Sequence, residues 1–285
     1  MTLDPTIARR TWRMVEPLHG MIYFSPEAAD AFAGLGLVGR MGYFGSRAAP
    51  MGPVTAEVVI ATFYNFRPEL VRASIPAAWE RATPEQIIAA RLQAADGALR
   101  RYMPDALGTP ELAEAATLAR RAAETACAHV EGRPLFAGHA SLPWPDEDHL
   151  VLWHAQTLLR EYRGDGHIAA LVTAGLSGLE AAITHVATGE VPGAVLVSTR
   201  AWPADEWDAG VDALRARGIL EPGGEVVLTE AGQRQRQWIE DATDASAVAA
   251  YVPLGDDGCA RLRALARPWS RAVIDSGLLA APPPG

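Results

Sequence analysis

The feature that most constrains the fold is a tripeptide of Ser or Thr, then Pro, then Glu, which occurs three times. It is found at Ser25-Pro26-Glu27, Thr83-Pro84-Glu85 and Thr109-Pro110-Glu111. The hydroxyl caps a helix N-terminus, the proline lacks an N–H that would be unpaired there, and the acid complements the helix dipole. Together with the spacing of apolar residues, these signals predict a mainly α fold. The expected helices cover residues 6–22, 26–34, 55–66, 68–79, 84–101, 110–130, 149–162, 167–188, 205–217, 230–241 and 257–275.

The composition is that of a folded, acidic protein with a sizeable core. Of 285 residues 49% are hydrophobic, and 34 Asp and Glu outnumber 25 Lys and Arg, for a formal net charge of -9. This balance disfavours nucleic acid and anionic membranes as partners, because phosphate is bound by Lys and Arg. With two cysteines and no apolar run of about 18 to 20 residues, the chain is expected to be cytoplasmic. Its length favours two halves, residues 1–140 and 141–285.

The clearest strand signal lies in the second half. A turn over residues 221–225 leads into the β-branched run 226–229, and another helix pattern follows. This order predicts a winged helix at about residues 200–241, with a small β wing. The segment resembles the MarR-type pattern at Leu214, Gly218, Ile219, Leu228, Thr229 and Gly232.

Further motifs carry a wider resemblance. They are Glu16–His19, Tyr23–Phe24, Gly42–Pro50, Phe63–Phe66, Leu142–Pro145, Leu152–His154 and Arg163–His167. On these motifs the chain, from about residue 8 to 245, resembles an actinobacterial family of SalK-like helix-turn-helix proteins. The resemblance implies a helix-turn-helix element but little about biochemistry, although some members lie among natural-product genes. A faint repeat, residues 75–79 against 198–202, suggests two fused winged-helix-like halves, so that the protein is a monomeric pseudo-dimer or a homodimer.

The helix that would read DNA is acidic. A recognition helix usually offers basic or polar side chains in its first two turns. Here those turns carry Asp205, Glu206 and Asp208, and the turn at 221–225 has two acids and no base. DNA binding is therefore not expected, and the fold element can persist without that function.

One face of the first helix mixes chemical groups that are unusual in a core. Trp12, Glu16, His19 and Tyr23 are spaced at i, i+4, i+7 and i+11, so they share that face. This row predicts either an acid/base site, with His19 and Glu16 as the exchanging groups, or a hydrogen-bonded contact between helices.

The glycine-rich segment 39–52 is expected to be a loop beside a pocket, with glycines where the backbone approaches a neighbour closely or takes a positive φ. Tyr43 and Arg47 would project into that pocket, where Arg47 would be a fixed cation for a carboxylate, phenolate or enolate; the alternative is an Arg that caps a helix end. Aromatic motifs at 63–66 and 153–154 would add apolar walls, although a lone His on an apolar face is commonly a core residue.

Residues 161–171, EYRGDGHIAAL, place several chemical groups ahead of a helix pattern. Two glycines flank Asp165, which is expected to cap the helix 167–188. His167 would lie in its first turn, where the helix dipole favours a neutral base. His185 would lie five turns further on, about 27 Å away, and could not share a site with it.

No metal, P-loop, dinucleotide or nucleophile motif is present, so no cofactor is expected; haem on His19, His154 or His167 is a minor alternative. The sequence predicts a protein that binds a small apolar or aromatic molecule. A cofactor-independent acid/base enzyme of secondary metabolism, of isomerase, lyase or cyclase type, is preferred over a ligand-responsive MarR-type regulator or a sequestering protein. The expected catalytic residues are His19, Glu16 and His167. The expected substrate contacts are Trp12, Tyr23, Tyr43, Arg47, Phe63, Tyr64, Trp153, His154, Tyr162 and Arg163.

Overall fold

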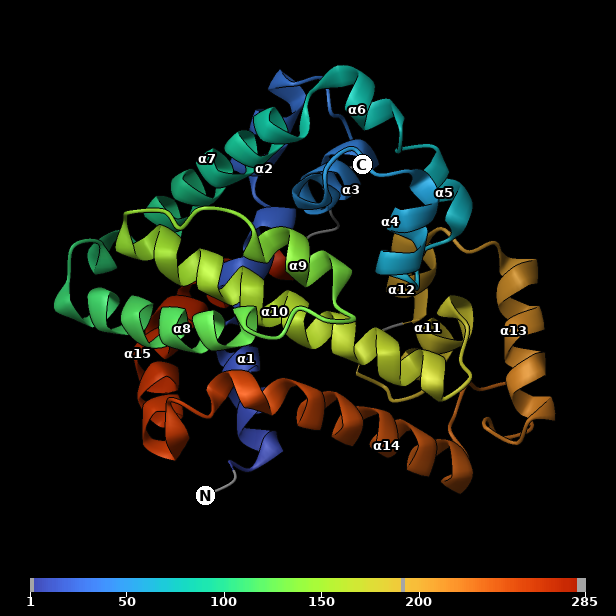
Figure 1. Cartoon of the computed structure of the whole chain (residues 1–285). Coiled ribbons are helices and arrows are strands. Elements are labelled where there is room, and N and C mark those ends of the chain that lie inside the picture. The colour runs from blue at the N-terminus through green and yellow to red at the C-terminus, as the bar shows by residue number, and fades with distance from the viewer. Residues whose placement is uncertain (1–2, 191–192, 281–285) are drawn as a thin grey trace.

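The computed structural model describes residues 3–190 and 193–280, which form a helical fold around one long helix, α10 (Asp148–Thr173) (Figure 1). The helices before it are α1 (Pro5–Gly20), α2 (Pro26–Gly34), α3 (Arg40–Ala48), α4 (Ala56–Phe63), α5 (Pro68–Arg72), α6 (Ala77–Arg81), α7 (Pro84–Tyr102), α8 (Pro110–Cys127) and α9 (Pro134–Ala140). Those after it are α11 (Gly178–Val186), α12 (Gly193–Arg200), α13 (Ala204–Ala216), α14 (Glu230–Ala247) and α15 (Gly255–Asp275). The expectation of a mainly helical protein is confirmed.

The proline-marked helix starts are where the sequence predicts them. Ser25, Thr83 and Thr109 each accept a backbone N–H in the first turn of α2, α7 and α8. Thr83 and Gln86 form the expected capping box, in which each side chain accepts from the other residue's backbone. Each cap satisfies N–H groups that have no partner within the helix.

Two hydrophobic clusters share α10. The larger one combines the first part of α10 with α1 to α9 and α15, and the smaller one combines the end of α10 with α11, α13 and α14. In Figure 1, α10 crosses the middle of the molecule, with α8 and α14 beside it and α11 to α13 gathered at one end. The division at residue 140 and the pseudo-dimer remain predictions. Within the described residues, no single helix has both the length and the hydropathy to cross a bilayer.

The glycine-rich segment 39–52 is helical, so the predicted loop is wrong. It forms α3 and a short 3-10 turn over residues 49–51. A Cβ on Gly42 would lie 3.1 Å from Phe32, and a Cβ on Gly45 would lie 3.3 Å from Ala78. Close helix packing therefore explains Gly42 and Gly45, whereas Gly39 and Gly52, at the two ends of the segment, take positive φ values of 58° and 80°.

The predicted helix break at residues 163–166 is also wrong. α10 continues to Thr173, and the chain turns only at 174–177, where Gly175 takes a φ of 67° and Ser177 caps α11. α11 is inclined to α10 by 101°. His185 is therefore not five turns along the helix of His167, and the distance argument that separated the two histidines fails.

The predicted β wing does not form. Within residues 3–190 and 193–280 there is no strand, and the segment contributes one isolated antiparallel bridge between Leu220 and Leu228. Pro222 has no N–H to donate, and Gly223 takes a φ of 130°, so the chain turns too soon for a ladder to extend. The helices α11 and α13 pack together, and the bridge joins α13 to α14.

Candidate functional site

Side chains from four helices meet in a buried polar centre next to the middle of α10. α1 contributes Glu16 and His19, with Tyr23 just beyond its end, α3 contributes Tyr43 and Arg47, α7 contributes Arg91, and α10 contributes Arg160 and Glu161. The centre thus brings together side chains that are up to 145 residues apart in the sequence.

The predicted row on α1 is engaged at every position. The Trp12 indole N–H donates to Glu16 Oε2 at 3.0 Å, and Arg160 Nε donates to Glu16 Oε1 at 2.8 Å. Further along, His19 Nε2 lies 2.9 Å from the Tyr23 hydroxyl. The row faces α10, as a hydrogen-bonded contact between helices would require.

His19 has a defined proton arrangement. The Thr157 hydroxyl donates to the carbonyl of Trp153 at 3.0 Å, so its oxygen accepts from His19 Nδ1–H at 2.9 Å. His19 Nε2 is then unprotonated and accepts from the Tyr23 O–H. Burial, followed by the positive charge of Arg160, holds the pKa of His19 well below its ordinary value, so the ring is neutral.

Glu161 is the anion between two arginines. It is 3% exposed, it accepts from Arg47 Nη2 through both oxygens, at 2.9 and 3.1 Å, and it accepts from Arg160 Nη1 at 2.7 Å. Burial alone would raise the pKa of Glu161, but Arg47 and Arg160 outweigh it and lower the pKa to about 2. The carboxylate is therefore charged at neutral pH, and its charge is paired with Arg47 and Arg160 within the centre.

The tyrosines join the centre to a cavity of about 220 Å³ between α2 and α3. Tyr23 and Tyr43 both line it, with ring centroids 5.3 Å apart, and its other walls are mostly apolar, including Ile22, Phe32 and Leu37. The Tyr43 hydroxyl accepts from Arg47 Nη1 at 2.9 Å. Burial would raise the pKa of Tyr43, but Arg47 and more distant arginines outweigh it and lower the pKa.

Arg91 is buried without a partner. It is 3% exposed, and neither of its terminal nitrogens has a hydrogen-bond partner among the described residues. Its guanidinium carbon lies 5.0 Å from the centroid of the Trp153 ring and 5.8 Å from that of Tyr23. Aromatic faces attract a cation but do not satisfy its N–H groups.

Sequence reasoning missed Arg91, Arg160 and Glu161, although a signal existed for the first. Arg91 lies on the same face of α7 as Ile87, Ala94 and Ala98, which are all buried. This pattern is consistent with a buried cation, but it is equally consistent with an Arg that extends its head group into solvent, so the pattern alone does not decide between them.

The predicted site residues separate into two groups. Eight of them lie in or against the centre: Trp12, Glu16, His19, Tyr23, Tyr43, Arg47, Phe63 and Trp153. Five have other main contacts: Tyr64 with the carbonyl of Leu176, His154 with Trp144, Tyr162 with Phe136, Arg163 with Asp244, and His167 with Thr243. His19 and Arg47 therefore converge, and His167 does not join them.

Asp165 does not cap its own helix, because it lies in the interior of α10. Its Oδ2 accepts from the Phe136 N–H at 2.9 Å, in the first turn of α9. Arg133, the residue before α9, supplies no side-chain cap, so Asp165 of α10 takes that role. His167 also lies within α10. Its pKa is lowered to about 4 by burial and then by the charge of Arg236, and not by a helix terminus.

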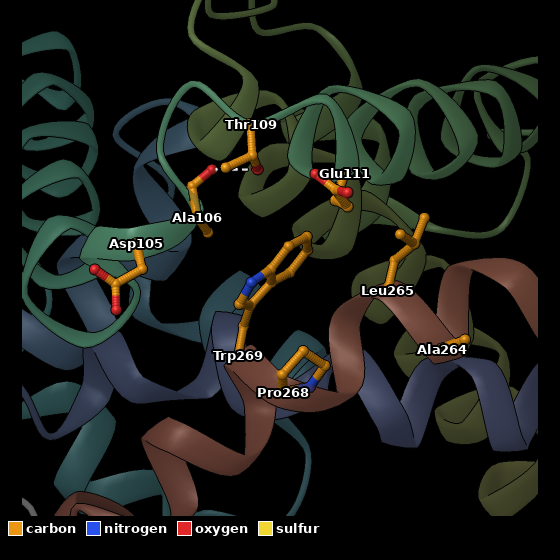
Figure 2. A pocket seen from close by; sticks show the side chains of 8 residues that line it. All are labelled: Asp105, Ala106, Thr109, Glu111, Ala264, Leu265, Pro268 and Trp269. Atoms are coloured by element: carbon orange, nitrogen blue, oxygen red, sulfur yellow. Dashed lines mark hydrogen bonds between the residues drawn. The ribbon is translucent and has the colours of Figure 1, made fainter.

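A second hollow, of about 300 Å³, lies on the surface between α15 and the turn before α8 (Figure 2). The Trp269 indole points across it, with Asp105 and Glu111 on either side. None of the predicted site residues lines it. Across the described residues, no group of three or more His, Cys, Asp or Glu could hold a metal ion.

A family model described as a helix-turn-helix family matches residues 8–280, which is nearly the whole chain. No curated protein and no solved structure matches the chain.

Proposed function

The chain belongs to this helix-turn-helix family, and from that premise and the buried polar centre we propose that it binds a small, largely apolar molecule with one acidic or enolisable group. Tyr43 is the observation that carries the proposal. Tyr43 is one of the residues that line the cavity, and its hydroxyl accepts a hydrogen bond from Arg47. The cavity thus has apolar walls and a polar end, the usual composition of a ligand site.

The volume limits the ligand. Drug-sized ligands occupy pockets of roughly 300–1,000 Å³, whereas this cavity is about 220 Å³. The best fit is therefore a molecule of about one ring, with its polar group against the tyrosines.

The same groups suit proton transfer. The lowered pKa of Tyr43 makes it the candidate base, and Tyr23, whose O–H is held by neutral His19, is the candidate acid. In this arrangement the phenolate form of Tyr43 removes a proton from carbon next to a carbonyl and becomes a phenol. Tyr23 turns its O–H from His19 Nε2 to the carbonyl oxygen, so that the products are an enol and the phenolate of Tyr23. Glu16, bonded to Arg160 and Trp12, orients its neighbours instead of exchanging protons itself.

The experiment is a titration of the purified protein with substituted benzoates and phenols, followed by tryptophan fluorescence. Tyr43→Phe removes one hydroxyl from the cavity wall, and Tyr102→Phe is the matched control at the end of α7. We expect a binder whose affinity falls about tenfold or more in Tyr43→Phe and is unchanged in Tyr102→Phe, since a hydrogen bond to a charged group contributes about 1.5–3 kcal/mol. Equal affinities in the two variants would contradict the proposal. Solvent deuterium incorporation into a bound carbonyl compound tests the catalytic step.

A ligand-responsive DNA regulator is the second candidate, favoured by the family and by the helices α11 to α13. Contacts at the start of α13 weigh against it. The Trp202 indole donates to the Asn65 carbonyl at 3.0 Å, and Glu206 pairs with Arg67 at 2.8 Å, so the turn that would enter a groove is held against the N-terminal part of the chain. A gel shift on the gene's own upstream DNA tests this: salt-sensitive, sequence-specific binding at nanomolar protein would favour the regulator.

A further inference from the structure

Four buried polar side chains near the middle of α10 share one property: each has a side-chain nitrogen that is shielded from solvent and has no hydrogen-bond partner within residues 3–190 and 193–280. They are Arg91, His139, Trp153 and His154, and we call them the unpaired cluster. They come from α7, α9 and α10, and all four are at most 5% exposed. Buried polar groups in folded proteins are nearly always paired.

Arg91 lies close to Trp153, and its charge acts on both histidines. The Arg91 guanidinium carbon is 5.0 Å from the centroid of the Trp153 ring. Burial, followed by the charge of Arg91, lowers the pKa of His139 to about 3 and that of His154 to about 4, so both imidazoles are neutral. The carboxylate that acts on His139 is Glu161, which is already bonded to Arg47 and Arg160.

We propose that the unpaired cluster is an enclosed binding site for a small oxyanion of the carboxylate class. Arg91 offers both terminal nitrogens, in the planar fork that binds a carboxylate through two parallel hydrogen bonds. The Trp153 indole adds an N–H donor, and the neutral imidazoles can add further donors. The anion neutralises the one arginine of the centre that no protein carboxylate reaches.

The carboxylate has two possible sources: a free small acid, or the acidic end of the molecule proposed for the adjoining cavity. Tyr23 connects the two places, because it lines the cavity and its ring is 5.8 Å from the Arg91 guanidinium carbon. The site itself does not depend on the cavity having a ligand.

The test is thermal unfolding of the whole chain with formate or benzoate, each against chloride at the same ionic strength. Arg91→Met removes the charge and keeps the volume, and Arg121→Met, on the exposed face of α8, is the matched control. We expect formate to raise the melting temperature of the protein and of Arg121→Met, with an apparent affinity about tenfold or more lower in Arg91→Met. Without added anion, Arg91→Met should be at least as stable as the original, because it removes an uncompensated buried charge.

Trp153→Phe keeps one aromatic ring and removes the indole N–H together with the rest of the fused ring, so it should fold and bind formate more weakly. The source of the carboxylate follows from the effect of Tyr43→Phe on the two anions. If this substitution weakens benzoate binding and leaves formate binding unaffected, the acidic end of the cavity ligand is a second source. If it affects the binding of both anions equally, the source is a free small acid. Equal responses to carboxylate and chloride, or equal anion responses in Arg91→Met and Arg121→Met, would overturn the site. Either result would leave the proposal for Tyr43 intact, since that proposal is tested by Tyr43→Phe alone.

Discussion

Two successive stretches of α10 carry buried charge clusters that contain the same residue types but differ in how those residues are paired. Around the first stretch, residues 153–161, three arginines lie near two carboxylates; the arginines are Arg47, Arg91 and Arg160, and the carboxylates are Glu16 and Glu161. Around the second, residues 163–167, three arginines from α1, α10 and α14 also face two carboxylates, Glu240 and Asp244. Counting charges does not distinguish the two clusters.

The difference lies in Arg91. In the second cluster every guanidinium reaches a carboxylate: Arg9 and Arg163 reach Asp244 at 2.7 and 2.9 Å, and Arg236 reaches Glu240 at 2.7 Å. In the first cluster Arg47 reaches Glu161, Arg160 reaches both Glu161 and Glu16, and Arg91 has no hydrogen-bonded anion among the described residues. Each arginine of the second cluster thus has a carboxylate, whereas the first cluster leaves one arginine without one, and the anion site proposed above would supply it.

Glu161→Gln should break the first cluster and have the largest effect. It leaves Arg47 and Arg160 without their buried anion, and breaking a buried pair in this way costs about 3–5 kcal/mol of the free energy of unfolding. Asp244→Asn is the counterpart in the second cluster, where Glu240 remains near both Arg9 and Arg163. We expect the smaller loss there. Urea unfolding of both variants measures the difference, and an equal or larger loss for Asp244→Asn would mean that the clusters do not differ in pairing.

The sequence predicted the row on α1 well and the role of α10 poorly, for physical reasons. A helical period places Trp12, Glu16, His19 and Tyr23 on one face whatever surrounds them. It does not say which helix lies opposite, and therefore could not identify Glu161 as the anion of Arg47, 114 residues away. Arg91 stayed hidden because an Arg beside alanines can as easily extend its head group into solvent.

The fold was predictable where local chemistry decides it. Helices that begin with a capping hydroxyl and a proline start within one residue of their expected positions. The errors lie where glycine was interpreted as a break, at 39–52 and 163–166. Gly42 and Gly45 in the first place, and Gly166 in the second, allow two helices to approach closely, and this need arises only from the tertiary structure.

The two glycines of α10 near its second cluster should respond oppositely to alanine. A Cβ on Gly166 would lie 2.3 Å from Ser246 Oγ of α14, whereas a Cβ on Gly164 would meet nothing closer than Glu161 Oε2 at 3.5 Å. Gly166→Ala should therefore cost about 1–3 kcal/mol through overpacking. Gly164→Ala should be neutral or stabilise the helix by up to about 1 kcal/mol. Thermal unfolding of the pair tests this, and a destabilised Gly164→Ala with an unaffected Gly166→Ala would contradict the packing of α10 on α14.

Asp165, which lies on α10 beside the second cluster but is not paired with its arginines, should produce an effect that depends on pH. Burial raises its pKa to about 6, and the N–H of Phe136 offsets this only in part. Between about pH 4 and 6 the folded chain keeps a proton that the unfolded chain has lost, so the stability that this group contributes falls as the pH rises and the cost is complete above pH 6. Asp165→Asn removes the titration and keeps an oxygen for the Phe136 N–H. It should gain about 1–3 kcal/mol relative to the original chain between pH 4 and 7. Urea unfolding at a series of pH values gives this difference directly, because titration of the buried histidines is common to both proteins and cancels. A difference that does not change across this pH range would mean that the pKa of Asp165 is not raised and that its carboxylate is stabilised by charge, as the carboxylates of the two clusters are.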